Sequence, residues 1–215
     1  TGTLGAHKLS SKIIRVPNEL LVDSGIDMEA FLANRIASRL GRGESVYLVK
    51  GTGAGSPQQP LGLEASTSVG KVTAAADKLT WQEINGLIHS IDPAYRSAPQ
   101  FRLGFNDKTL QSIEEMVDGN NRPLWLPGID ADRPATILKQ KYFIDQAIAD
   151  IGAGKKFMFG GDMSQFIVRR VRYMALKRLV ERFADYDQTG FLAFHRFGCV
   201  LQDSAAIKAL QGKPA

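Results

Sequence analysis

Apolar residues recur at spacings of three and four between positions 27 and 49, which is the period of one face of an α-helix. The members of this face are Met28, Phe31, Leu32, Ile36, Leu40 and Tyr47. Asp27 at the start is typical of a helix N-terminus. At ~1.5 Å per residue the predicted helix is roughly 35 Å long.

Two glycines interrupt this pattern. Gly41 and Gly43 each cost a helix about 1 kcal/mol relative to alanine. Gly43 falls on the apolar face, where it would let a strand backbone approach closely. The alternative to one long helix is a pair of shorter helices that break at Gly41.

A glycine-rich segment follows the predicted helix. Its members include Gly51, Gly53, Gly55 and Pro57. Glycine loops can bind phosphate, but in such loops the glycines precede a helix, and a lysine followed by serine or threonine completes the motif. Here the glycines follow a helix, and the lysine with its serine or threonine is missing after Gly55. We therefore interpret the segment as a structural turn that ends the helix.

The middle of the chain contains two further helix signals and one strand signal. They predict helices over 80–90 and 106–117 and a strand over 101–105. The first helix begins with a capping box formed by Thr80 and Glu83. The second begins with an Asn-Asp dipeptide, which is a common cap. Residues 136–148 mix apolar and polar positions and are ambiguous.

The last third of the chain is expected to be rich in strands. Residues 155–159 are predicted to be extended, and the Gly-Gly-Asp at 160–162 to turn the chain. A long strand covered on both sides is predicted over 166–183, with a helix as the alternative for its second half. A further strand is predicted over 191–201 and a short terminal helix over 204–210.

The composition is that of an ordinary globular protein: 215 residues, of which 44% are hydrophobic and 23% charged. No apolar run reaches the ~18 residues of a membrane span, so we expect no membrane contact. The net charge of +5 permits binding to nucleic acid without specifying it. Five arginines are spread along one patterned segment: Arg169, Arg170, Arg172, Arg178 and Arg182. We interpret this segment as a solvated or intersubunit face, with direct DNA binding as the alternative.

The titratable residues lack the pattern of a catalytic or metal site. The candidates are His7, His89 and His195, the acidic pairs Asp130/Asp132 and Asp185/Asp187, and Cys199. The histidines are far apart in the sequence and have no second ligand at a metal-binding spacing. The acidic pairs lie in turn-like segments, where aspartate serves local hydrogen bonding. The cysteine is expected to be a buried, inert thiol. We predict no enzyme, cofactor or metal; an active site assembled from distant residues is a competing hypothesis.

Several separated stretches, taken in order, agree with one known family. They are 19–24 with the helix and glycine turn that follow, 81–87, 124–127, 159–166 and 200–206. The chain resembles the phage major capsid protein family, the Hong Kong-type shell protein of tailed phages. In that family a Glu-Leu-Leu-x-Asp-Ser stretch leads into a long spine helix, and a glycine-rich turn closes the helix.

The resemblance implies an α+β fold, the Hong Kong-type capsid fold, with a spine helix, a peripheral β-sheet domain and an axial α/β domain. Carried over, the peripheral domain comprises 1–71 and 158–197, and the axial domain comprises 72–157 and 198–215. Family members usually carry an N-terminal arm and a long hairpin, the E-loop, before the point where this chain starts. The chain is therefore expected to be the core of such a protein, and to stay monomeric or form small oligomers by itself.

The resemblance also implies a structural subunit of an icosahedral phage or prophage capsid that encloses DNA non-specifically. Such subunits form hexamers and pentamers in the host cytoplasm, with a portal and a scaffold or protease as partners during assembly. Distributed charges set the register between neighbours in such a lattice. The candidate intersubunit contacts are Arg35, Arg39, Arg169, Arg172 and Glu181. The alternatives are an encapsulin-like shell protein and a basic nucleic-acid-binding module.

One property of some family members is not expected here. Those members join subunits by an isopeptide bond between an E-loop lysine and an asparagine of the late peripheral strands. No asparagine follows Asn121 in this sequence, and the outer E-loop is not part of it. We therefore predict that this chain forms no such crosslink.

Overall fold

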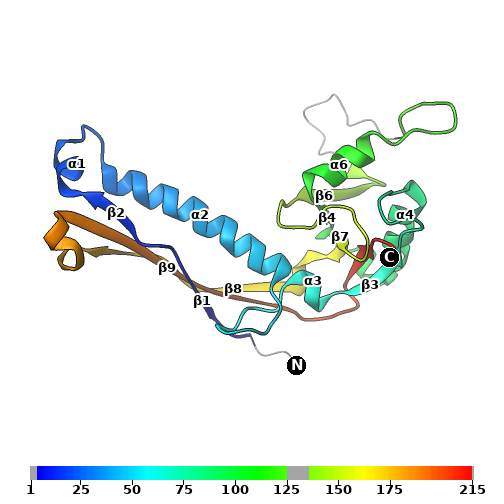
Figure 1. The fold of residues 1–215 in the computed structure, drawn as a ribbon. Coiled ribbons are helices and arrows are strands. Elements are labelled where there is room, and N and C mark those ends of the chain that lie inside the picture. The colour runs from blue at the N-terminus through cyan, green and yellow to red at the C-terminus, as the bar shows by residue number, and fades with distance from the viewer. Residues whose placement is uncertain (1–3, 125–135, 215) are drawn as a thin grey trace.

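The structure is a computed structural model that describes residues 4–124 and 136–214. It is elongated, with one long helix beside a long four-stranded sheet at one end and a six-stranded sheet with short helices at the other (Figure 1). We call these parts the elongated half and the compact half. The mixture of helices and strands confirms the predicted α+β class. The predicted stretch 125–127 and the pair Asp130/Asp132 lie outside the described residues.

β9 (Gln188–Leu201) is the central strand of the elongated half. β8 (Phe166–Leu179) pairs with it antiparallel along one edge. β1 (His7–Ser10) and β2 (Ile14–Pro17) pair with it, also antiparallel, along the other edge. The two long strands that the sequence predicts are confirmed. They form a sheet because consecutive segments fold back on each other.

A short turn joins the two long strands. The helix considered for the second half of 166–183 is wrong for most of that range, because β8 continues to Leu179. Only a 3₁₀ segment, η2 (Glu181–Tyr186), follows it. Asp187 then takes the left-handed conformation, with φ 50°, and reverses the chain into β9.

One continuous helix, α2 (Met28–Lys50), lies beside the sheet over 23 residues (Figure 1). Its N-cap is Asp27, whose side chain accepts a hydrogen bond from the backbone N–H of Ala30 at 3.0 Å. A short helix, α1 (Asn18–Asp23), precedes it. The sequence pattern did not predict this short helix.

The two-helix alternative is wrong, because α2 does not break at Gly41. Before this glycine the apolar face of α2 packs on the sheet through Ile36 and Leu40, and after it Glu44 contacts side chains of β8 and β9. The buried residues of that interface are Val16, Ile36, Leu40, Phe191 and Ala193. A Cβ added at Gly43 would lie 3.5 Å from the side chain of Leu9. Gly43 therefore faces a side chain of β1, and the predicted close approach of a strand backbone to Gly43 is wrong.

The compact half is built on six strands in the order β3-β10-β7-β4-β6-β5. In chain order they are β3 (Ser68–Val72), β4 (Phe101–Phe105), β5 (Thr136–Ile137), β6 (Gln140–Ile144), β7 (Lys156–Asp162) and β10 (Ile207–Gln211). β10 lies between β3, to which it is parallel, and β7, to which it is antiparallel. The sheet thus joins segments that are far apart in the sequence.

Short helices accompany this sheet. They are α3 (Leu63–Ser66), α4 (Trp81–His89), α5 (Pro93–Arg96), α6 (Asp107–Glu114) and the 3₁₀ segment η1 (Met163–Gln165). The predicted capping box at the start of α4 is present. The core includes the fully buried Ile84, Leu87, Leu103, Phe105, Ile113 and Phe157. α6 is shorter than predicted, because the chain leaves the helix at Glu115 and Val117 is half exposed.

Two predictions for the last third are wrong. The expected terminal helix over 204–210 contains the strand β10, because hydrogen bonds to β3 and β7 are available on both of its edges. The expected turn at Gly160-Gly161 is part of β7. Glycine is needed there for close packing: a Cβ at Gly161, where φ is +150°, would lie 2.2 Å from the backbone oxygen of Ala206.

The two halves are joined through a shared buried cluster and several polar contacts. The cluster includes Val49 at the end of α2, Phe159 of β7 and Ile207 of β10. Ser45 Oγ on α2 lies 2.7 Å from Asp145 Oδ2, just beyond β6. β3 and β7 each extend across a predicted domain boundary, and the domain bounds stay a prediction.

Candidate assembly surfaces

The glycine-rich segment lies at the C-terminus of α2. The N–H of Gly51 donates to the backbone oxygen of Tyr47 at 3.0 Å, and the N–H of Gly62 donates back to Gly51 at 2.8 Å. A Cβ at Gly51 would lie 2.2 Å from the backbone oxygen of Pro60, so this position has no room for a side chain. Gly53 and Gly55 have φ of +72° and +104°, which glycine adopts without strain. A phosphate loop would instead present its N–H groups at a helix N-terminus.

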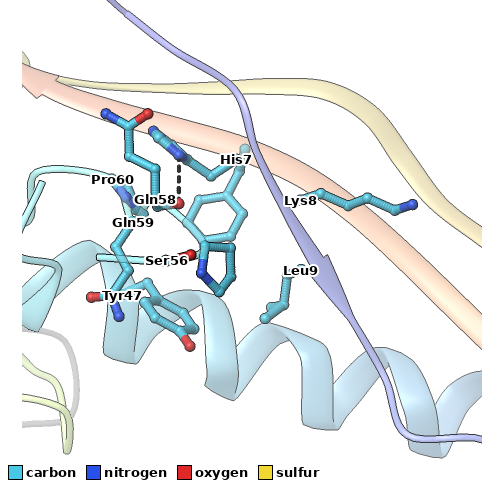
Figure 2. A pocket seen from close by; sticks show the side chains of 10 residues that line it. His7, Lys8, Leu9, Tyr47, Ser56, Gln58, Gln59 and Pro60 are labelled. Carbon is cyan, nitrogen blue, oxygen red and sulfur yellow. Dashed lines mark hydrogen bonds between the residues drawn. The ribbon is translucent and has the colours of Figure 1, made fainter. Parts of the chain in front are cut away.

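A cavity of about 140 Å³ lies between this turn, β1 and the end of α2 (Figure 2). His7 donates through Nδ1 to the backbone oxygen of Gln58 at 2.9 Å, which ties β1 to the turn. Tyr47 and Leu9 face the same space (Figure 2). The lining residues include no carboxylate. The cavity therefore lacks the pair of carboxylates that many acid–base sites use.

Glu44 forms a charged contact between helix and sheet that the sequence analysis missed. It lies on the apolar face of α2 and is only 7% exposed. Its Oε1 accepts from Nε of Arg170 on β8 at 2.8 Å, and its Oε2 lies 3.2 Å from Nε2 of His195 on β9. The signal was available: Glu44 follows Leu40 by four residues, and a carboxylate on a buried face needs a partner. We call this group the Glu44 cluster.

The predicted contact residues on α2 are exposed. The guanidinium of Arg35 lies over the ring of Phe31, 5.4 Å from its centre. Arg39, one turn further along, lines a shallow cavity between α2 and β1. Both side chains are therefore accessible to a neighbouring molecule.

The other predicted contact residues lie on or beside β8. Arg169 is exposed, and its Nη1 donates to the backbone oxygen of Leu4 at 3.3 Å. Glu181 is exposed at the start of η2, past the other end of β8. The side chain of Arg172 lies outside the described part of the structure. The described members therefore do not form one cluster, and their role in contacts stays a prediction.

An apolar surface at the tip of the elongated half was not predicted. It comprises Leu20, Val22, Ile26, Val180 and Tyr186, of which Val22 is 81% and Tyr186 68% exposed. We call it the distal tip. Its two sides are held together by an ion pair between Arg178 and Glu29 at 2.6 Å and a hydrogen bond from Asn18 to Asp187 at 2.6 Å. Exposed apolar side chains that gather in one place are typical of contacts between proteins.

The described residues show no candidate metal site. Residues 4–124 and 136–214 contain no group of three or more metal-ligating side chains. Cys199 is buried, its thiol donates to the backbone oxygen of Leu61 at 3.3 Å, and burial raises its pKa to about 11. It therefore stays protonated and unreactive at neutral pH. Asp187, a member of the second acidic pair, accepts a hydrogen bond from the side-chain amide of Asn18.

No helix among the described residues is long and apolar enough to cross a membrane.

Comparison with known proteins identifies the family. The model of the phage capsid family matches residues 1–212. The chain belongs to the phage capsid family. A search of curated proteins gives no significant match.

Solved structures share the fold over nearly the whole chain. The capsid of a native GTA particle is 25% identical, with a TM-score of 0.84, and the alignment covers 98% of this chain and 73% of that one. The structure from Gordonia phage Cozz is 12% identical, with a TM-score of 0.72 and coverage of 99% and 71%. That from Mycobacterium phage Adephagia is 13% identical, with a TM-score of 0.69 and coverage of 99% and 73%.

The chain is a structural capsid subunit of a phage particle and has the Hong Kong-type fold. Its family points to a non-catalytic role in the capsid of the virion and to association with further copies of itself.

Proposed function

We propose that this capsid subunit forms an icosahedral shell of hexamers and pentamers around a DNA genome. The observation that carries the proposal is the match of 98% of the chain to the GTA capsid, a particle computed with C5 symmetry. Closed shells need interfaces between different surfaces of identical subunits. An elongated molecule with separate charged and apolar surfaces is suited to this geometry.

The distal tip and the distributed charges are the proposed contacts between copies. The tip supplies apolar area, which drives association. Arg35, Arg39, Arg169, Arg172 and Glu181 supply charges, which fix register and exclude wrong pairings more than they add affinity. Individual contacts can be weak, because many of them act together in a lattice.

The chain is proposed to form two domains with different positions in the shell. Residues 1–71 and 158–197 form a peripheral domain, and residues 72–157 and 198–215 form an axial domain near the symmetry axes. The net charge of +5 favours non-specific contact with the enclosed DNA. Assembly takes place in the host cytoplasm, with a portal and a scaffold or protease as partners.

Electron microscopy of the full-length gene product that contains this chain tests the proposal. Purified protein is incubated at increasing concentration, and particles are followed by negative stain and by sedimentation. Uniform closed shells support the proposal. A protein that remains monomeric at every concentration, with and without co-expressed scaffold, contradicts it.

A further inference from the structure

The sheet of the elongated half has two faces with different chemistry. α2 packs on one of them through a cluster that includes Phe191 and Ala193 of β9 (Figure 1). Because side chains alternate along a strand, Leu192, Phe194 and Arg196 point to the opposite face. We call this opposite side the open face of the sheet.

The strand register brings basic residues from all four strands to the open face. These exposed cations are Lys8, Arg15, Lys177 and Arg196. Residues directly opposite each other in an antiparallel pair share a face. Lys177 is opposite Leu192, Lys8 is opposite Arg196, and Arg15 is opposite Gly190. Arg169 lies at one end of the same face and already donates to the backbone oxygen of Leu4, so it is not counted with them.

An aromatic side chain joins two of these cations. The ring centre of Phe194 lies 4.0 Å from Nζ of Lys8 and 5.7 Å from Nζ of Lys177. These contacts confirm that the two lysines share one face of the sheet. A ring attracts a cation but does not neutralise its charge. The ammonium groups therefore remain positive on the exposed surface.

The positive charge of the open face is not compensated within the described chain. The four strands contain no aspartate or glutamate. On the face that meets α2, Arg170 pairs with Glu44 and Arg178 pairs with Glu29. Within residues 4–124 and 136–214, none of the four open-face cations forms an ion pair with a carboxylate. The excess charge of the sheet is thus confined to one face.

We propose that the open face binds the phosphate backbone of double-stranded DNA. This inference rests on the proposed shell function, which supplies DNA as the enclosed polyanion. The cations span positions 190–196 of β9, which is about 20 Å of strand. A duplex of that length carries about 12 phosphate charges, so all four cations can contact one segment whatever its sequence.

Two other occupants fit this face less well. An acidic protein segment would need carboxylates at matching positions along the same 20 Å or so of strand, whereas DNA presents phosphates all along its length. Single-stranded DNA binds through bases that stack on aromatic rings. The ring of Phe194 already has Lys8 above it, so it is not free to stack on a base.

Fluorescence anisotropy of the purified chain with a labelled duplex of mixed sequence tests the site without requiring assembly. Binding is measured over a series of salt concentrations. The logarithm of the binding constant should fall against the logarithm of salt with a slope of about −3.5, because each phosphate contact contributes about −0.9. A slope shallower than about −1, or no binding at low salt, would overturn the proposal.

Variants with a matched control test the face itself. Arg196→Gln and Lys177→Gln should each weaken duplex binding roughly fivefold and reduce the salt slope by about 1. The control is Arg35→Gln, because Arg35 is an exposed arginine that also lies over a phenylalanine ring but belongs to α2. It should change binding less than about twofold. Thermal unfolding checks that all three variants fold like the parent chain. Equal losses in Arg35→Gln and Arg196→Gln would show that net charge, and not this face, binds the DNA.

Competition identifies the occupant. Polyglutamate should displace the labelled duplex only in large excess over duplex phosphate, as should unlabelled single-stranded DNA. Displacement by polyglutamate at equal charge concentration would make an acidic protein segment the occupant and would overturn the DNA assignment. Displacement by single-stranded DNA at equal phosphate concentration would overturn the preference for the duplex.

Shell assembly separates this inference from the proposed function. The double variant Lys177→Gln with Arg196→Gln in the full-length protein should still form shells, with less bound DNA than the parent. Shells of the parent protein whose open face is turned away from the enclosed DNA would overturn the inference and leave the shell function intact. A chain that binds duplex DNA through this face but forms no shells would contradict the shell function and leave the DNA site standing.

Discussion

The two halves of the molecule are stabilised in different ways. The compact half has a six-stranded sheet and a core of fully buried residues, which includes Leu103 and Phe105. The elongated half has one helix on one long sheet, a smaller buried cluster, and the Glu44 cluster at their interface. A long, thin shape encloses little interior. The elongated half is therefore expected to depend more on single polar contacts and, in the shell, on neighbouring copies.

The largest effect is expected in the compact core. Phe105→Ala should lower the free energy of unfolding by about 3–5 kcal/mol, because the fully buried ring leaves a cavity behind. Chemical denaturation of the purified chain measures it. Val117→Ala, at a half-exposed position of the same half, is the control and should cost below about 1 kcal/mol. Equal losses for the two variants would mean that the core does not carry the stability of this half.

The Glu44 cluster is the next test. Glu44→Gln should lower the free energy of unfolding by about 2 kcal/mol, because it removes the carboxylate that faces the buried His195 and the exposed Arg170. This loss of stability is smaller than that expected for a fully buried ion pair, because the side chain of Arg170 is largely exposed to solvent. The matched control is Glu29→Gln, which breaks the exposed pair with Arg178 and should cost below about 1 kcal/mol. Equal losses of stability in the two variants would contradict the hypothesis that the buried Glu44 contributes more to stability than the exposed Glu29.

The N-caps of α4 and α2 compare the two halves at the same position of a helix. Thr80→Ala at α4 and Asp27→Ala at α2 should each cost about 1 kcal/mol, because each removes a side chain that caps the N-terminus of a helix. Hydrogen exchange of the backbone amides shows which part of each helix loses protection. Loss of protection after Asp27→Ala should remain near the start of α2, since the rest of the helix is held by the sheet. Loss over the whole helix would show that the elongated half unfolds as one unit.

The smallest effect on the free chain is expected at the distal tip. Val22→Ser should change the free energy of unfolding by less than about 0.5 kcal/mol, because the side chain is already in solvent. The same change should lower the yield of shells from the full-length protein. Val72→Ser, at an exposed valine of the compact half, serves as the control for shell yield. Normal shells from Val22→Ser would exclude this side chain as a contact.

Local sequence patterns determined the elements that depend on neighbours along the chain. The spacing of Ile36 and Leu40, with an acidic cap at Asp27, located α2 to within one residue at each end. Thr80 and Glu83 located the start of α4 in the same way. Because helix caps and apolar faces involve residues three or four positions apart, the information is contained in a short window. The order of several such windows was enough to identify the capsid family.

Tertiary structure alone decided the features that join distant segments. β10 is a strand because β3 and β7 offer it hydrogen bonds on both edges, although its own sequence also suits a helix. The Gly160-Gly161 pair of β7 is typical of a turn in the sequence, and only the backbone of Ala206, which leaves no room for a Cβ at Gly161, explains it as part of a packed strand. The partners of Glu44 and the cations of the open face likewise come from elements far apart in the chain. Such contacts depend on which surfaces meet after folding, and no local period records that.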